Sequence, residues 1–327
     1  MTHTPTIHAG TKPRPAYAQS LRIAAGDIKL AHSVFALPFA VLAAFLAREP
    51  ASPWRHFALQ LALVVFCMVL ARTWAMLFNR LADRDIDARN ERTARRALAS
   101  GTLSPTRGWT IALASAALFV VGTGGFYLLD RNPWPMILAA PVLAWIAFYS
   151  ITKRFTALCH VFLGGALGAS PIAAVIAIRP ASLPMLFESS AAAAGTAPSW
   201  TIPLLALFVV LWVAGFDVIY ALQDLEFDRR ENLRSIPARL GPRGAAWVAR
   251  LLHAGAFGVL ILAWHREPRF GPIVLGAVAL VGVILTLEHT IVARRGLAGI
   301  PMAFFTLNGV VSLVLGAAGC AEVVMGA

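Results

Sequence analysis

Two clusters of acidic residues have the spacing best suited to chemistry. The first reads NRLADRDIDARNERTARRALASG, and within it Asn79, Asp83 and Asp87 follow one another at intervals of four. On a helix that continues through the cluster, these residues lie one above another on a single face. Stacked carboxylates repel unless a cation compensates them, and Mg²⁺ binds through one or two carboxylates together with substrate phosphates. The cluster predicts Asp83 and Asp87 as magnesium ligands, with Asn79 at the diphosphate.

The second cluster reads DVIYALQDLEFDRRENLRSIPARLG and repeats the pattern. Asp217, Tyr220, Asp224 and Asp228 recur at helical spacing, and Asp217 lies within an apolar segment, where an ionisable side chain indicates a functional site. Two such ladders predict two Mg²⁺ ions around one diphosphate, with Asp224 and Asp228 as the second pair of ligands. The remaining phosphate charge is assigned to three arginines: Arg92, Arg96 and Arg234.

A single acidic cluster is also explained by mixed charges that solvate a membrane surface. The paired clusters favour a site, because Asp83 and Asp224 are 141 residues apart and so are Asp87 and Asp228. Together the two clusters hold more than half of the chain's 16 acidic residues. The equal offset predicts a duplicated four-helix unit whose two copies face one cavity.

The elements that must position these clusters are membrane helices. The chain of 327 residues is 58% apolar and only 13% charged, with a mean hydropathy of +0.71, so the lipid bilayer is its main solvent. Apolar stretches of the length that crosses a bilayer recur along it. Nine spans are predicted: Ile28 to Ala47, His56 to Phe78, Trp109 to Leu129, Pro133 to Ser150, Ala157 to Ile178, Trp200 to Leu222, Ala245 to Trp264, Gly271 to Leu287 and Gly299 to Val324.

The predicted fold is therefore an all-α polytopic membrane protein of about nine transmembrane helices, built from two four-helix repeats plus one helix around a central cavity. Residues 1–26 are predicted to be a disordered cytoplasmic arm, and residues 27–327 a single transmembrane domain. The segment Pro180 to Ser199, rich in Ala, Ser and Pro, is predicted to be an external loop.

A net charge of +12 is typical of proteins that bind nucleic acid, but the distribution of the charge along this chain argues against such a partner. With the N-terminus in the cytoplasm, 21 of the 28 Lys and Arg residues fall on the cytoplasmic side and six on the other, while Arg72 lies within a span. This asymmetry predicts a multi-pass protein of the inner membrane with a cytoplasmic N-terminus and no nucleic-acid partner.

Both clusters resemble the motifs of the UbiA superfamily of intramembrane prenyltransferases. The family's NDxxDxxxD motif and the stretch after it correspond to NRLADRDID and ERTARRALASG, and its DxxYxxxDxxxD motif to DVIYALQDLEFD. The resemblance covers nearly the whole chain and implies nine helices around a lateral, lipid-accessible cavity, with two Mg²⁺ ions that bridge a polyprenyl diphosphate. Three residues depart from the pattern. Arg80 replaces a frequent Asp, Arg234 a frequent Lys and Asn232 a frequent Gly.

Within the family, IKLAHSVFALPFA and YSITKRFTALCHVFLG are most similar to 4-hydroxybenzoate polyprenyltransferases of ubiquinone synthesis. They are also similar to enzymes that prenylate a naphthoate-type acid on the futalosine route to menaquinone, and the sequence does not separate the two. Both acceptors are aromatic carboxylic acids. Lys153 and Arg154 match the family's cationic pair, so Arg154 is the expected anchor of the acceptor carboxylate, and Lys29 and His32 are further candidates at the cavity.

The expected reaction is electrophilic aromatic substitution, in which Mg²⁺ and basic residues stabilise the departing diphosphate. Tyr220 is the preferred aromatic partner of the allylic cation. Three other aromatic residues are plausible by position: Phe78, Tyr149 and Phe155.

Three alternatives remain at this point. Secondary transport also uses repeats and intramembrane acids, although an alternating-access site would lie nearer the membrane midplane. Prenyl transfer to haem, chlorophyllide or a sugar lipid is a second alternative. A purely structural role is the third, but it would not need paired carboxylates.

Overall fold

The computed structural model describes residues 17–27, 35–179 and 200–326, and in these ranges every regular element is a helix. Eight described helical segments are long and apolar enough to cross a membrane. They contain α3 (Trp54–Ala82), α5 (Pro105–Asp130), α6 (Trp134–Thr152), α7 (Cys159–Ile178), α10 (Thr201–Ala221), α12 (Ile236–Arg266), α13 (Pro272–Arg295) and α14 (Asn308–Met325). A shorter apolar helix, α2 (Leu37–Ala47), is the described end of the first predicted span. The all-α polytopic prediction is confirmed.

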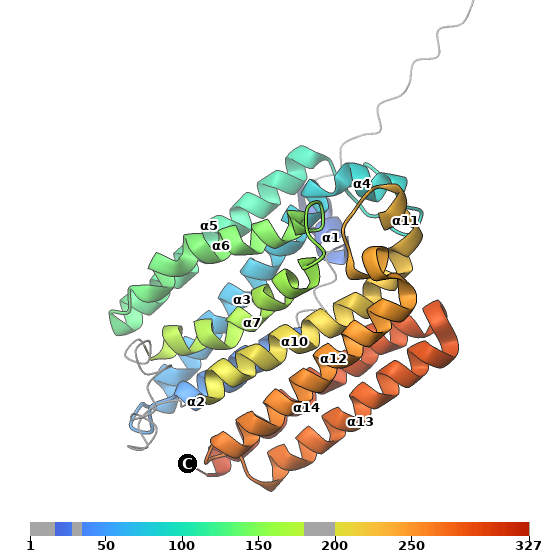
Figure 1. Cartoon of the computed structure of the whole chain (residues 1–327). Coiled ribbons are helices and arrows are strands. Elements are labelled where there is room, and N and C mark those ends of the chain that lie inside the picture. The colour runs from blue at the N-terminus through green and yellow to red at the C-terminus, as the bar shows by residue number, and fades with distance from the viewer. Residues whose placement is uncertain (1–16, 28–34, 180–199, 327) are drawn as a thin grey trace, which may run out of the picture.

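The helices run roughly side by side as one bundle (Figure 1). Helices α5 and α6 lie at one side of it, α13 lies at the other, and α10 passes through the middle, in contact with α7 and α12. Many large apolar side chains on the outer faces are exposed, which is expected where lipid replaces water.

Close contact between α7 and α10 depends on glycine. A Cβ added to Gly164 on α7 would lie 2.3 Å from the carbonyl oxygen of Val210 on α10. A backbone oxygen cannot move aside as a flexible side chain can, so these helix backbones approach only because this residue has no side chain.

Two of the described helices begin at a serine whose side chain satisfies a backbone N–H group. The Ser104 hydroxyl accepts a hydrogen bond from the Arg107 N–H at the start of α5, and the Ser235 hydroxyl accepts one from the Ala238 N–H at the start of α12. Helix α12 is interrupted at Gly241, whose φ of 70° favours glycine, and Pro242 follows.

The two acidic clusters have the same local architecture. Helix α3 ends at Ala82, Asp83 has φ −96° and ψ 8°, and a short helix α4 (Arg84–Arg89) follows. In the second half, α10 and the 3₁₀ turn η2 (Leu222–Asp224) end at Asp224, with φ −105° and ψ 5°, and the short helix α11 (Leu225–Arg230) follows. Both aspartates therefore sit at the same kind of helix break, which agrees with a duplicated unit.

One expectation differs from the structure at the N-terminus. The predicted disordered arm contains a helix, α1 (Tyr17–Asp27), whose Ser20 and Ala24 are buried. The Asp27 carboxylate accepts a hydrogen bond from the Ala97 N–H at 3.0 Å and lies 3.4 Å from Arg80 Nε. These contacts hold α1 against the first acidic cluster. Residues 1–16 and the predicted loop at 180–199 lie outside the described residues.

Candidate active site

One large cavity brings the two acidic clusters together. Its volume is about 920 Å³, and its walls are mostly apolar residues of α3, α6, α7 and α10. All five predicted aspartates line it: Asp83, Asp87, Asp217, Asp224 and Asp228. The sequence predictions placed these residues around one space, and the geometry agrees.

The first cluster keeps its helical register across the break at Asp83. The Asp83 N–H donates to the Asn79 carbonyl at 2.9 Å, and the Asp87 N–H donates to the Asp83 carbonyl at 2.7 Å. Asp83 and Asp87 are only 1% and 5% exposed. These two carboxylates would repel strongly without nearby cations.

Each of those two carboxylates has a basic partner. Lys153 Nζ lies 2.5 Å from Asp83 Oδ2, and Arg154 Nη2 lies 3.3 Å from Asp83 Oδ1. Arg96 Nη1 donates to both oxygens of Asp87, at 2.7 and 2.8 Å. The cluster is thus neutralised by a residue of its own loop and by the pair that follows α6.

Arg92 joins the two clusters. Its guanidinium donates to both carboxylate oxygens of Asp224, at 2.8 Å from Nε, and to the Tyr220 hydroxyl at 2.9 Å. Asn90 Nδ2 also donates to Asp224 Oδ1 at 2.8 Å. Burial by itself lowers the pKa of Arg92, but the hydrogen bonds and charge of Asp224 outweigh this and raise it above its ordinary value. Arg92 therefore remains charged.

The other two aspartates of the second cluster are bound by a serine and a histidine. The Ser235 hydroxyl donates to Asp228 Oδ2 at 2.7 Å. His160 Nε2 accepts a hydrogen bond from the Ile236 N–H at 3.2 Å, so its ring proton is on Nδ1, which donates to Asp217 Oδ2 at 2.7 Å. Within the described residues, Asp217 forms no ion pair with a Lys or Arg, and its carboxylate lines the cavity.

Of the other predicted residues, some line this cavity and others do not. Asn79, Arg92, Arg96, Lys153, Tyr149 and Tyr220 line it. Arg154, Arg234, Phe78 and Phe155 are not among its lining residues. Arg154 Nη2 is directed to the Ala82 carbonyl at 2.6 Å, and Arg234 Nη1 to the Phe155 carbonyl at 2.9 Å. Lys29 and His32 lie outside the described residues.

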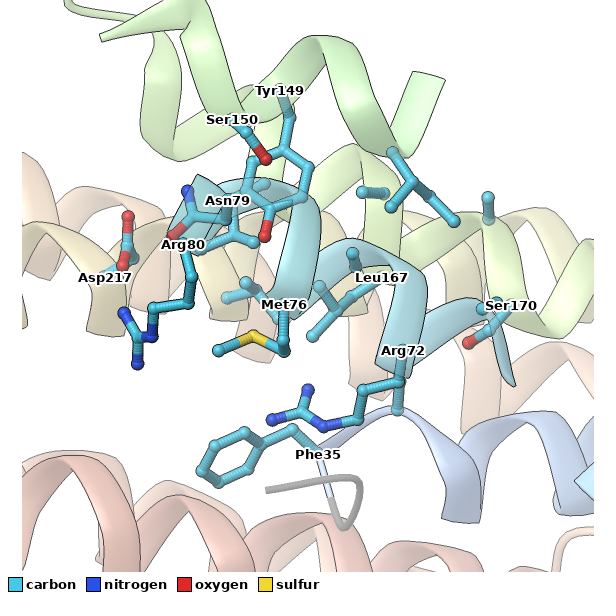
Figure 2. Close-up of a pocket in the computed structure, with 18 of the residues that line it drawn as sticks. Phe35, Arg72, Met76, Asn79, Arg80, Tyr149, Ser150, Leu167, Ser170 and Asp217 are labelled. Carbon is cyan, nitrogen blue, oxygen red and sulfur yellow. The ribbon is translucent and has the colours of Figure 1, made fainter. Parts of the chain in front are cut away.

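Two arginines of α3 lie in the cavity wall, and the sequence reasoning gave them no binding role. Figure 2 shows Arg72 and Arg80 on α3, with Tyr149 on α6 and Asp217 on α10 around the same space. Within the described residues, Arg72 Nε has no hydrogen-bond partner and the side chain forms no ion pair. Arg80, which replaces a frequent Asp of the family motif, is within ion-pair distance of Asp27. A charged residue inside an apolar span, seven positions before Asn79, was the available signal for Arg72.

An aromatic group on the cavity wall was also missed. Phe304 and Phe305 line the cavity, and the Phe304 ring centroid lies 4.2 Å from that of Tyr220 and 5.1 Å from that of Phe216. Both phenylalanines belong to a π-helix, Met302–Leu307, a form that often marks functional sites.

A buried amide holds this π-helix in place. Asn308 Nδ2 donates to the Ala303 carbonyl at 3.0 Å, and the Trp212 indole N–H donates to Asn308 Oδ1 at 2.6 Å. Asn308 Nδ2 also lies 3.3 Å from a carboxylate oxygen of the fully buried Glu288. These bonds fix the backbone that presents the two phenylalanines to the cavity.

The donor atoms at the cavity mouth suit magnesium. The described residues contain no group of three or more Asp, Glu, His or Cys side chains arranged as a metal cage. The candidate ligands are oxygens only, from Asp83, Asp87, Asp224 and Asp228, with the Asn79 amide beside them. Mg²⁺ prefers oxygen, and it uses one or two carboxylates with substrate phosphates rather than an all-protein cage. The residues present fit this ion.

Comparison with known proteins agrees with the motifs. Residues 36–310 match the UbiA prenyltransferase family. A 4-hydroxybenzoate octaprenyltransferase of Aromatoleum aromaticum is 30% identical over 253 residues, which cover 76% of this chain and 77% of that protein. A mitochondrial 4-hydroxybenzoate polyprenyltransferase of Arabidopsis thaliana is 31% identical over 180 residues, 55% of this chain and 39% of that protein.

Solved structures share the fold. The apo structure of a UbiA homolog from Aeropyrum pernix K1 has a TM-score of 0.73 at 32% identity and covers 88% of this chain and 96% of that one. A UbiA homolog from Archaeoglobus fulgidus bound to GPP and Mg²⁺ has a TM-score of 0.64 at 17% identity, with 92% and 99% covered, and supports the fold alone. The chain is a membrane enzyme and belongs to the UbiA prenyltransferase family.

Proposed function

We propose that this enzyme transfers a polyprenyl group from a polyprenyl diphosphate to the ring of an aromatic carboxylic acid, 4-hydroxybenzoate in ubiquinone biosynthesis. One observation supports this most strongly. The two acidic clusters meet at one large apolar cavity. In its wall, about three helical turns before Asp83, lies Arg72, which has no ion pair among the described residues. The names of the relatives that act on 4-hydroxybenzoate support the choice of acceptor.

The diphosphate is assigned to the mouth of the cavity. Asp83, Asp87, Asp224 and Asp228 would hold Mg²⁺, which when bound supplies positive charge to the leaving diphosphate. Three basic side chains reach the same space, because they contact these carboxylates: Arg92, Arg96 and Lys153. Their N–H groups are placed to bind diphosphate oxygens.

The acceptor carboxylate is assigned to Arg72. Its guanidinium faces the cavity with Nε unpartnered among the described residues, and a planar fork of donors matches a carboxylate. Arg154, the anchor expected from the sequence, is occupied by the Ala82 carbonyl and by Asp83. A small aromatic acid bound at Arg72 would lie inside the cavity, with its ring among apolar side chains such as Met76 and Leu167.

The residues near the proposed diphosphate site suggest roles in each step of the reaction. The allylic C–O bond breaks and its electron pair leaves with the diphosphate, while the faces of Tyr220 and Phe304 stabilise the allylic cation. The ring carbon ortho to the acceptor hydroxyl forms the new C–C bond and then loses its proton. Asp217 is proposed to take that proton, because it lines the cavity without a Lys or Arg partner among the described residues and is held in place by His160. The apolar walls keep water from the cation.

Acceptor identity is tested directly. Purified enzyme in lipid receives Mg²⁺, a prenyl diphosphate and either 4-hydroxybenzoate or a naphthoate-type acid, and products are measured by mass spectrometry with an EDTA control. Product from 4-hydroxybenzoate is expected. Product from the naphthoate acid alone would move the enzyme to menaquinone synthesis. Product from neither, in folded protein that binds the diphosphate, would refute an aromatic acid as acceptor.

The orientation in the inner membrane is proposed from charge. Most Lys and Arg residues lie in the arm and in loops at the end of the bundle that carries both acidic clusters, which favours that end in the cytoplasm. Reporter fusions after Arg96 and after Arg295 should both report a cytoplasmic location. A periplasmic signal from either fusion would contradict this orientation.

A further inference from the structure

A second hollow lies on the outer surface of the bundle, between α12 and α13. Its volume is about 400 Å³, and it is lined by Arg250, Thr286, His289, Thr290, Ala293 and Arg294. None of these residues lines the active-site cavity. Figure 1 shows α12 and α13 on the opposite side of the bundle from α5 and α6. A ligand in this hollow would be separate from the prenyl-transfer site.

The hollow contains two cations without carboxylate partners. Arg250 lies eight residues beyond Pro242, so it is about 12 Å along α12 from the kink. Its guanidinium lies 5.1 Å from the ring of Trp247. Within the described residues, neither Arg250 nor Arg294 forms an ion pair. Cations on a lipid-facing surface are costly when they lack an anion, so the hollow favours an anionic ligand.

The other polar side chains of the hollow are already engaged, so the guanidinium groups of Arg250 and Arg294 are its hydrogen-bond donors for an anionic ligand. The Thr286 and Thr290 hydroxyls donate to the carbonyls of Gly282 and Thr286, each at 2.8 Å. His289 Nε2 is engaged with His253 Nδ1 at 3.1 Å. Two neighbouring guanidinium forks match the oxygens of a phosphate group.

Exposed apolar side chains lie one to three positions from the lining residues on both helices, and these side chains are called the rim of the hollow. Leu251 and Trp247 on α12 are 69% and 63% exposed, and Val283 and Leu287 on α13 are also exposed. Exposed apolar side chains of this kind suit contact with acyl chains. We propose that the hollow between α12 and α13 binds an anionic phospholipid, with its phosphate on Arg250 and Arg294 and its acyl chains against this rim.

Native mass spectrometry of the delipidated enzyme in detergent tests the proposal. Phosphatidylglycerol, zwitterionic phosphatidylcholine and inorganic phosphate are titrated separately. The wild type should bind phosphatidylglycerol more tightly than the other two. Loss of charged hydrogen bonds in Arg250→Gln/Arg294→Gln should weaken phosphatidylglycerol binding by about tenfold or more. Arg266→Gln, at the other end of α12, is the matched control and should bind as the wild type does.

Three results would overturn the proposal. The first is equal phosphatidylglycerol affinity in the wild type and the double variant. The second is equal binding of phosphatidylglycerol and phosphatidylcholine by the wild type. The third is inorganic phosphate binding as tightly as phosphatidylglycerol, which would identify a phosphate site without a lipid. If the double variant lacks the cooperative thermal unfolding of the wild type, the single variants replace it. An unchanged phosphatidylglycerol affinity in both would overturn the assignment.

Discussion

Replacement of Arg72 is the sharpest test of how the acceptor binds. Arg72→Gln removes the guanidinium fork but keeps a polar side chain in the wall of α3. Hydrogen bonds that involve a charged group contribute about 1.5–3 kcal/mol each. Loss of one such contact corresponds to a roughly 10- to 150-fold weaker interaction, at about 1.4 kcal/mol per factor of ten. We expect the KM for 4-hydroxybenzoate to rise by that factor.

Arg72→Gln should affect neither the stability of the enzyme nor the binding of the prenyl diphosphate. The Arg72 Nε has no partner among the described residues, so Arg72→Gln breaks no ion pair in the described structure and should not lower the thermal unfolding temperature. The KM for the prenyl diphosphate should stay within about twofold, because the proposed diphosphate site is at the acidic clusters, about three turns away. Arg72→Lys keeps the charge and loses the fork, so its acceptor KM should lie between those of the wild type and Arg72→Gln.

Arg154→Gln is the matched control, since it removes another arginine expected to bind the acceptor. Arg154 contacts Asp83 and the Ala82 carbonyl, so this variant should disturb the first acidic cluster and leave the acceptor KM nearly unchanged. Steady-state kinetics with each substrate varied in turn separate the two outcomes. An unchanged acceptor KM in Arg72→Gln, together with a raised one in Arg154→Gln, would refute our assignment and restore the one made from the sequence.

Four further outcomes are expected. Asp224→Asn removes a carboxylate of the second cluster, so prenyl transfer in lipid vesicles should fall about 100-fold or more, and near-normal turnover would contradict its role. Phe304→Leu should lower kcat about 2- to 30-fold through a lost cation–π contact, while Phe304→Tyr keeps the rate; equal rates for both would exclude this contact. Gly164→Ala should lower the unfolding temperature in detergent because its Cβ meets the Val210 carbonyl, whereas Gly276→Ala, with open space around it, should not. EDTA should abolish product formation and added Mg²⁺ should restore it; EDTA-resistant turnover would argue against magnesium.

The aspartates were predictable because their helical spacing is kept in the structure, even where the helix is interrupted. Intervals of four placed Asn79, Asp83 and Asp87 on one face, and the backbone hydrogen bonds across Asp83 preserve this register although α3 ends there. Acidic residues are rare in membrane helices, so Asp217 also stood out against an apolar background. The membrane helices were predictable from the length of the apolar stretches, since few segments other than membrane spans are so uniformly apolar.

The partners of these aspartates were not predictable in the same way. Asn90 and Ser235 bind Asp224 and Asp228, but Asn and Ser are common in loops and nothing local distinguishes them. The π-helix at Met302–Leu307 depends on Asn308, which is held from α10 by Trp212. Helix α1 forms in a polar segment because Asp27 meets Arg80 and the Ala97 N–H, 53 and 70 residues away respectively. Each case is decided by a tertiary contact.

Arg92 shows why the two clusters behave as one site. Its guanidinium spans Asp224 and Tyr220 of the second cluster, while its backbone belongs to the loop after the first. Without Arg92, Asp224 would keep Asn90 as a neutral donor but lose its cation, and negative charge at the cavity mouth would rise. The proposed function also assigns the diphosphate to this guanidinium, so Arg92 would have two roles: to neutralise Asp224 in the free enzyme and to bind the anionic substrate. A lysine there would retain the charge but could not bridge Asp224 and Tyr220 with a planar fork, which is a physical reason for arginine at this position.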